Sequence, residues 1–365
     1  MTDLSVVILA GGKASRMLKQ NKGLIEFNKK PLVHYVIEAT KGFSKQIFIS
    51  ANNQQQVYSK LFSLLVLSDD TPGFQGPLSG IVKALGKTRE YLLILPCDTP
   101  FVEAELIARL VNSGKNNKAQ AHVAHDGKSL QPAFALIKAD TLDDLRQFMA
   151  NNGRKLADWL ERLDYQIVDM SDHPEWFVNI NSQIDFARFC RKTMYKDTPI
   201  LGFVGFSGTG KTTLLSKLIA SLRQHKINVG LIKHAHHDFD IDTPGKDSYV
   251  LRKSGARQVM VASDKRFALM VEAENYIKPE LDNLLEKFTT DKLDLILIES
   301  FKSANINKIE VNRQELEKSY LYLRDSNIIA IATDLEPAKI VGKLALDLND
   351  IGKLTEFVLS YLRCN

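Results

Sequence analysis

The second half of the chain carries the pattern that most constrains its fold. An apolar run at residues 199–204 leads into a loop that satisfies GxxxxGK[ST], and leucines at helical spacing follow. In such a strand–loop–helix unit the loop N–H groups cradle a β-phosphate, the lysine reaches the β- and γ-phosphates, and the last hydroxyl binds Mg²⁺. The pattern therefore predicts a P-loop α/β unit with a nucleotide site made by Gly205, Ser207, Gly208, Thr209, Gly210, Lys211, Thr212 and Thr213.

An acidic residue is expected beside that loop. The apolar run at residues 293–298 predicts a strand, and Glu299 follows it directly. A carboxylate at this place can orient a water molecule or the hydration shell of the metal ion. The alternative is a strand-end glutamate that pairs with Lys302.

Residues 233–238 read KHAHHD and are rich in histidine. Histidines at positions i and i+2 of an extended segment share one face but do not supply a full ligand set, so a structural zinc site is not expected. Because the segment follows a predicted strand at 229–232, we expect Lys233, His237, Asp240 or Asp242 to act near the phosphates.

The first half also opens with an apolar run and a glycine turn. Residues 5–17 read SVVILAGGKASRM, and Lys22 follows. The adjacent Gly11 and Gly12 let the backbone approach a ligand closely, while Arg16 and Lys22, together with Lys13, can neutralise a polyphosphate. The alternative is a tight strand–helix turn with solvated basic side chains.

A second segment favours the ligand-binding interpretation of that turn. Four apolar residues, 92–95, place Asp98 at the carboxyl end of a buried strand, where open α/β sheets bind ligands. A carboxylate there is suited to hold Mg²⁺ between phosphate oxygens. The alternative is that Asp98 caps the helix that follows Pro100. Together with the glycine turn, Asp98 favours the metal.

Strands alternate with helical patterns in both halves, which predicts the α/β class with mostly parallel sheets. We expect helices at residues 32–40, 80–85, 103–112 and 141–150. The polar stretch before Pro199 divides the chain into domains at residues 1–192 and 199–365. Strands are expected at residues 46–50, 64–67, 92–95, 121–124 and 133–137 of the first domain, and at 229–232, 258–262, 293–298 and 328–333 of the second.

Composition excludes several classes of protein. The chain has 365 residues, 44% of them hydrophobic and 25% charged, which does not fit a disordered or fibrous protein. Its net charge of +5 is spread without a basic tail, so no nucleic-acid partner is expected. Three distant cysteines argue against a disulfide framework, and no apolar stretch is long enough to span a membrane. We expect a cytoplasmic protein.

Residues 4–190 resemble the MobA-type molybdenum cofactor guanylyltransferases. The matching motifs are LAGGKASRM with Lys22, GPLSG at 76–80, PCDTP at 96–100, the Gln131-Pro132 pair, and NINS at 179–182. The chain departs from the family pattern at Leu18, Asn21 and Ser50, where Gly, Asp and Asn are usual. The resemblance implies a Rossmann-like nucleotidyltransferase fold.

The same resemblance implies the roles of individual residues. Leu9, Ala10, Gly11, Gly12, Lys22, Asn52, Asp69 and Asp98 would bind the guanine nucleotide. Arg16, Lys22 and Asp98 would be catalytic, with Mg²⁺ held by Asp98. Asn179 and Asn181 would line the pterin side. Because related cytidylyltransferases tend to have alanine at the second glycine, Gly12 favours GTP over CTP.

Residues 200 to about 345 resemble the MobB-type GTP-binding proteins of molybdopterin-guanine dinucleotide biosynthesis. The motifs are the P-loop, KHAHHDFDID at 233–242, PGKDSYVLRKSGA at 244–256, and DLILIESFK with KIEV between residues 294 and 311. Ser300 stands where the family has glycine. The resemblance implies a GTP-binding adaptor with weak hydrolysis, whose metal ion contacts Thr212.

Together the two resemblances imply a fusion. The first domain would join GMP from GTP to the terminal phosphate of molybdopterin or molybdenum-molybdopterin and release pyrophosphate. The second would assist it, and cofactor-delivery or molybdoenzyme-maturation proteins would receive the product. The alternatives are a nucleotidyltransferase that uses CTP or a sugar phosphate, or an inactive cofactor-carrying module fused to the P-loop unit.

Overall fold

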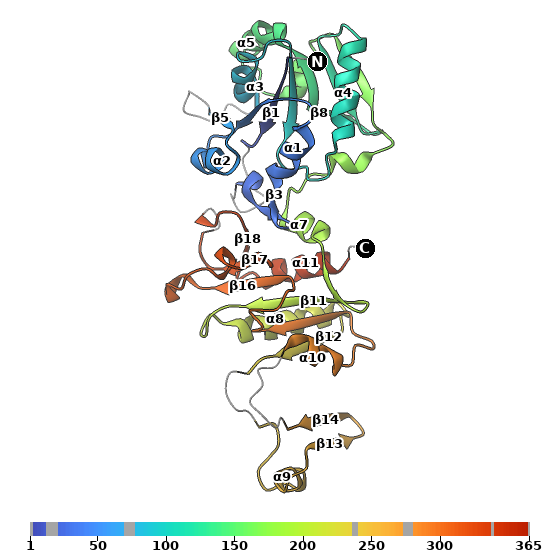
Figure 1. Cartoon of the computed structure of the whole chain (residues 1–365), viewed down its shortest axis with the longest axis vertical. Helices are drawn as coiled ribbons and strands as arrows, with labels where there is room; N and C mark the ends of the chain where they lie inside the picture. Colours follow the sequence, from blue (N-terminus) through green and yellow to red (C-terminus); the bar gives the residue numbers. More distant parts are fainter. Residues whose placement is uncertain are drawn as a thin grey trace.

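The computed structural model describes residues 3–11, 21–68, 77–235, 240–272, 280–336 and 339–363. Two sheets lie one beyond the other along the long axis of the molecule, and a hairpin with a short helix projects beyond the second (Figure 1). Gly12, Arg16, Asp69 and His237, which the sequence analysis singled out, lie outside the described residues.

The first sheet has the strand order β5-β4-β1-β6-β8-β7-β9. The strands β5, β4, β1 and β6 are parallel, whereas β8 runs antiparallel to both β6 and β7. The strands are β1 (Leu4–Leu9), β4 (Gln46–Ser50), β5 (Leu65–Leu67), β6 (Tyr91–Pro96), β7 (Ala121–His125), β8 (Leu130–Lys138) and β9 (Tyr165–Asp169), with β2 (Glu26–Phe27) and β3 (Lys30–Pro31) as a separate pair. The helices are α1 (Leu32–Thr40), α2 (Gln55–Phe62), α3 (Pro77–Leu85), α4 (Ala104–Asn116), α5 (Leu142–Ala150), α6 (Leu156–Leu160) and α7 (Gln183–Phe189), with 3₁₀ turns η1 (Lys22–Leu24), η2 (Ala139–Thr141) and η3 (Pro174–Phe177).

The second sheet has the order β12-β15-β11-β16-β17-β18 and is parallel throughout that path, while β10 adds antiparallel to β11. Its strands are β10 (Thr193–Tyr195), β11 (Thr198–Val204), β12 (Val229–Lys233), β15 (Leu295–Glu299), β16 (Lys308–Asn312), β17 (Ile328–Thr333) and β18 (Leu344–Asp347). The helices are α8 (Lys211–Gln224), α9 (Asp247–Lys253), α10 (Leu281–Glu286) and α11 (Ile351–Leu362), with 3₁₀ turns η4 (Gln314–Leu316) and η5 (Leu321–Leu323). The α/β class is confirmed, and the direction of β1 and β11 places Gly11 and the P-loop at the carboxyl edges of their sheets.

The strand expected at residues 258–262 exists but has a different role. As β13 (Gln258–Ser263) it pairs antiparallel with β14 (Arg266–Val271) in a two-stranded sheet, so its expected place in the parallel sheet was wrong. Two residues, Asp264 and Lys265, connect the strands, and this short connection allows only an antiparallel hairpin. The apolar side chains of Met260 and Phe267 consequently remain exposed.

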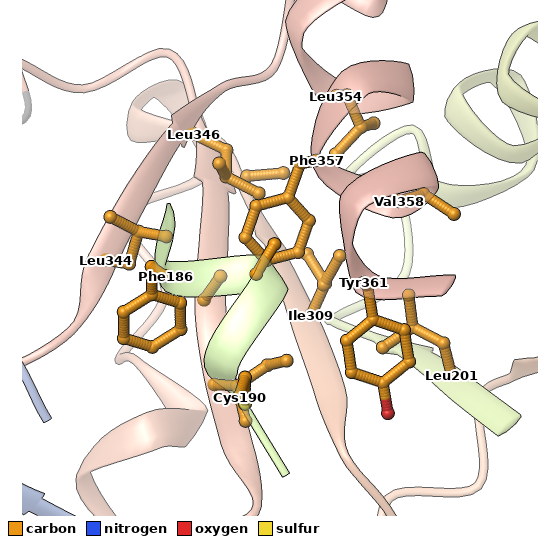
Figure 2. Packing of buried hydrophobic residues seen from close by; sticks show 14 of the residues in the cluster. Phe186, Cys190, Leu201, Ile309, Leu344, Leu346, Leu354, Phe357, Val358 and Tyr361 are labelled. Atoms are coloured by element: carbon orange, nitrogen blue, oxygen red, sulfur yellow. The ribbon is translucent and has the colours of Figure 1, made fainter. Parts of the chain in front are cut away.

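One hydrophobic core joins the two halves. Phe186 and Cys190, in and just after α7, are buried with Leu344 and Leu346 of β18 and with Phe357 of α11 (Figure 2). The sequence places α7 in the first domain, yet its apolar face packs on elements of the second. The domain limits 1–192 and 199–365 remain a proposal, and one of the core clusters is shared by the two halves. None of the described helices is long and apolar enough to cross a membrane.

Candidate functional site

The carboxyl ends of four parallel strands meet at one edge of the first sheet. The carbonyl of Leu9, at the end of β1, accepts a hydrogen bond from the Cys97 N–H (3.2 Å), and the Ala10 N–H donates to the Ser50 carbonyl (2.9 Å). These bonds extend the strand pairing by one residue on each side of β1. The turn that begins at Gly11, the segment with Asn52 after β4, and Asp98 after β6 therefore start side by side.

Three residues distant in the sequence come together at this edge. The Lys22 ammonium lies 3.4 Å from the Asp98 carboxylate and donates a hydrogen bond of 2.7 Å to the Asn181 side-chain oxygen. The Ile180 N–H donates to the Asp98 carbonyl (2.8 Å), which fixes the segment of Asn179 and Asn181 beside the strand end. Burial raises the pKa of Asp98, while Lys22 opposes this shift. A cation, a carboxylate and an amide thus face one small region.

Asp98 does not cap the following helix. That helix, α4, begins at Ala104, and its N-cap residue is Glu103. The Asp98 carboxylate is instead engaged with Lys22, so the capping alternative was wrong for this residue.

Tyr58 is a functional neighbour that sequence reasoning missed. Its hydroxyl, on the buried side of α2, donates to the Asn21 side-chain oxygen over 2.6 Å, and burial raises the pKa of Tyr58 well above its usual value. A β-carbon at Gly23 would lie 2.4 Å from the Tyr58 oxygen, so a larger residue there would force the Tyr58 ring to move. Tyr58 therefore holds the residues on both sides of Lys22. The signal in the sequence was weak, because a tyrosine in an amphipathic helix is usually a core residue.

Ser50 also has a packing role. A β-carbon at Gly80 would lie 1.9 Å from the Ser50 hydroxyl, so the glycine of the GPLSG motif allows α3 to pack against the end of β4. This close approach accounts for the glycine at position 80.

The P-loop has the local geometry that the sequence predicts. Gly208 and Gly210 have φ values of +85° and +84°, a backbone region that favours glycine. The Lys211 ammonium at the start of α8 donates to the carbonyls of Gly205 (3.1 Å) and Phe206 (2.7 Å), and burial lowers the pKa of Lys211. Lys211 thus lies across the loop in the position from which it can turn to a phosphate.

Glu299 ends β15 beside this loop and is only 4% exposed. It accepts a hydrogen bond of 3.1 Å from the Thr212 hydroxyl, and the Lys233 ammonium lies 3.5 Å away. The ion-pair partner is Lys233 rather than Lys302, whose ammonium lies 4.7 Å from the centre of the Phe206 ring. The strand order β12-β15-β11 explains this, since β12 and β11 flank β15.

Asp240 and Asp242 are engaged elsewhere. Asp240 pairs with Arg252 of α9 (2.5 Å), and Asp242 accepts from Ser248 of the same helix (2.9 Å). The structure places them with α9, whereas the Lys233 side chain reaches the Glu299 carboxylate and the His234 N–H donates to the Glu299 carbonyl over 3.2 Å.

Both donor sets suit Mg²⁺. The described residues contain no grouping of three or more histidine, cysteine, aspartate or glutamate side chains, as a site made only of protein ligands would need. Mg²⁺ usually keeps several waters and takes one or two protein oxygens together with substrate phosphates. Asp98 in the first half, and Thr212 with Glu299 in the second, offer oxygens of this kind.

Comparison with known proteins separates the chain into two matches. Residues 6–167 match the MobA-like NTP transferase domain, and residues 200–334 match molybdopterin guanine dinucleotide synthesis protein B. A molybdenum cofactor guanylyltransferase of Shewanella sp. (strain MR-4) is 39% identical over 180 residues, which cover 49% of this chain and 91% of that protein. The molybdopterin-guanine dinucleotide biosynthesis adapter protein of Escherichia coli (strain K12) is 46% identical over 166 residues, covering 45% of this chain and 94% of that protein.

A solved structure aligns with part of the chain as well. It is molybdopterin-guanine dinucleotide biosynthesis protein A from Archaeoglobus fulgidus, with a TM-score of 0.44, 23% identity, and coverage of 50% of this chain and 95% of that one. The sequence matches each cover nearly the whole of a relative. The chain therefore carries a MobA-like nucleotidyltransferase domain followed by a MobB domain, and it belongs to the molybdenum cofactor guanylyltransferases and to the MobB adapter proteins.

Proposed function

We propose that the first half transfers GMP from GTP to the terminal phosphate of molybdopterin or molybdenum-molybdopterin. An oxygen of that phosphate attacks the α-phosphorus of GTP, the bond from the α-phosphorus to the bridging oxygen breaks, and pyrophosphate leaves. The observation that carries the proposal is the cluster of Lys22, Asp98 and Asn181 at the carboxyl edge of the sheet. This cluster offers a fixed positive charge and a metal-binding carboxylate where two phosphates must meet.

The chemistry requires charge neutralisation rather than a base. The attacking phosphate is already an anion at neutral pH, so the obstacle is repulsion between phosphates. Lys22 lowers this repulsion and stabilises the charge that develops on the pyrophosphate. Mg²⁺ bound at Asp98 would supply further positive charge between the phosphate oxygens. Asn181, with Asn179 close in sequence, would orient the pterin substrate.

The remaining nucleotide contacts are proposed from the resemblance of the first half to the MobA-type guanylyltransferases. Leu9, Ala10, Gly11 and Asn52 would surround the guanosine at the sheet edge. Gly12, Arg16 and Asp69, which lie outside the described residues, would complete the site.

For the second half we propose GTP binding at the P-loop with weak hydrolysis. Lys211 would exchange its two carbonyl partners for the β- and γ-phosphates, and the Thr212 hydroxyl would turn from Glu299 to Mg²⁺. Glu299 would then orient the hydration shell of the ion. We also propose that the product passes to cofactor-delivery or molybdoenzyme-maturation proteins.

A direct assay tests the proposed transfer. The full-length chain is incubated with Mg²⁺ and molybdate-loaded molybdopterin, with GTP or CTP supplied separately, and dinucleotide formation is measured. We expect faster turnover with GTP, loss of turnover in Asp98→Ala, and retained turnover in Lys211→Ala, which should lose GTP binding in the second half. Faster turnover with CTP would refute the choice of base, and an active Asp98→Ala would refute the metal role.

A further inference from the structure

The segment that carries Lys22 is attached to the second half of the chain. Four residues after Lys22, the Glu26 N–H donates to the Gly342 carbonyl over 2.9 Å. The Glu26 carboxylate also forms an ion pair with Lys343, whose side chain is only 4% exposed. Gly342 and Lys343 directly precede β18, the edge strand of the second sheet. The edge of the second sheet therefore holds β2, immediately beyond η1 with its catalytic lysine.

The segment that carries Asn181 is attached to the same strand. Two residues after Asn181, the buried Gln183 side chain donates to the Ala345 carbonyl over 2.6 Å. Phe186, on the next turn of α7, is buried with Leu344 and Leu346 (Figure 2). The start of α7, and with it the position of Asn181, thus depends on β18.

These two segments also pack against each other. The rings of Phe27 and Phe186 meet edge to face with centroids 5.7 Å apart, and Phe27 makes a similar contact with Phe101 at 6.0 Å. The Tyr35 hydroxyl donates to the Phe27 carbonyl (2.7 Å). A displacement of β18 would therefore move both sides of the Lys22–Asn181 contact.

We propose that residues 342–345 of the second half complete the transferase site by positioning Lys22 and Asn181. Lys343 and Gln183 are positioning residues, because they touch no substrate and act through the two side chains that do. The adapter half thus acts on the transferase half through an intramolecular contact, in which residues 342–345 hold the segments of Lys22 and Asn181. The inference rests on the proposed function for its substrates, but the contact itself lies in the described residues.

Three full-length variants test the contact. Lys343→Met removes the ammonium but keeps the length of the side chain, and Gln183→Met removes the hydrogen bond at nearly constant volume. Lys353→Met is the matched control, because it breaks a pair with Asp350 (2.9 Å) whose lysine is exposed and lies outside residues 342–345. Since a displacement of about 1 Å can cost up to about a hundredfold in rate, we expect kcat/KM for GMP transfer to fall at least about tenfold in the first two variants and to stay unchanged in the control. If Lys343→Met does not fold, Glu26→Gln breaks the same pair from the other side.

A double-mutant cycle separates positioning from general damage. If Lys343 acts through Lys22, adding Lys343→Met to a Lys22→Ala background should change activity less than about twofold. An equal loss in both backgrounds, or folded variants with activity within about twofold of the unmutated chain, would overturn the inference while leaving the proposed transfer intact.

If the unmutated chain makes no dinucleotide, the proposed transfer is refuted. A binding measurement then tests the positioning role by itself. GTP affinity of the first half is then measured in the Lys211→Ala background, where the second site is removed. Severalfold weaker binding with Lys343→Met supports the positioning role, and unchanged affinity overturns it.

Discussion

Ser300 is a residue whose replacement should stabilise the protein. It follows Glu299 with a φ of +76°, in the left-handed region, and its N–H donates to the Phe203 carbonyl over 3.0 Å. A non-glycine residue in this conformation costs about 1–2 kcal/mol. Glycine removes that cost but adds chain entropy to the unfolded state, which offsets about 0.5–1 kcal/mol. Taken at the midpoints of these ranges, about 1.5 and about 0.75 kcal/mol, Ser300→Gly should raise the free energy of unfolding by about 0.75 kcal/mol.

The gain is measured as a shift of the thermal midpoint of the full-length chain. For a folding unit of about 150–250 residues, such as the second half, about 1 kcal/mol corresponds to roughly 2–4 °C, so we expect an increase of about 1.5–3 °C. Ser300→Ala is the matched control, because it removes the hydroxyl but keeps the β-carbon that causes the strain. If Ser300→Ala gains as much as Ser300→Gly, or if Ser300→Gly gains nothing, the backbone explanation is wrong.

Three further predictions follow from single contacts. Lys308 is 1% exposed and its ammonium pairs with the Asp325 carboxylate over 2.6 Å. Lys308→Met should therefore lower the free energy of unfolding, measured by chemical denaturation, by about 3 kcal/mol or more, and a loss below about 1 kcal/mol would contradict this. Burial lowers the pKa of His122, whose Nδ1 contacts the Ser113 hydroxyl at 2.8 Å, so the contribution of His122 to stability is complete above pH 6.5 and is lost as the pH falls below that value. His122→Asn should reduce the loss of stability between pH 7 and 5, and an unchanged pH profile of stability would refute the assignment. Thr212→Val keeps the side-chain volume but removes the hydroxyl, so GTP affinity in the second half should lose its dependence on Mg²⁺. GTP titrations with and without EDTA measure this dependence, and a retained dependence would exclude Thr212 as a ligand of the metal ion.

Local sequence patterns predicted the site residues that lie at the ends of strands. β4 and α1 coincide with the expected residues 46–50 and 32–40, and Asp98 lies at the end of β6 as expected. The P-loop was predictable because its strand, glycines and helix are contiguous. In each of these cases the determining interactions lie within a few residues of one another.

The parts that could not be predicted depend on long-range packing. Tyr58 and Gln183 look like ordinary helical residues, and only the folded chain shows that they support Lys22 and Asn181. Lys343 lies 317 residues from Glu26, and no periodicity indicates such a pair. The strand at 258–262 was assigned to the wrong sheet because apolar runs in a buried strand and in an exposed hairpin look alike.

The edge strand β18 links the two halves physically, which a domain boundary drawn in the sequence does not show. Its amino end contacts the segments of Lys22 and Asn181, and the residues after its carboxyl end, Leu348 and Asn349, line a pocket with Gly210 and Lys217 of the P-loop unit. Four residues of strand span only about 13 Å, so the contact at the amino end of β18 and the pocket beyond its carboxyl end adjoin one short element. A nucleotide bound by the P-loop can influence transfer through β18 only if its affinity differs between two positions of this strand. Without such a difference, the second half contributes a fixed support whose effect is the same with and without GTP.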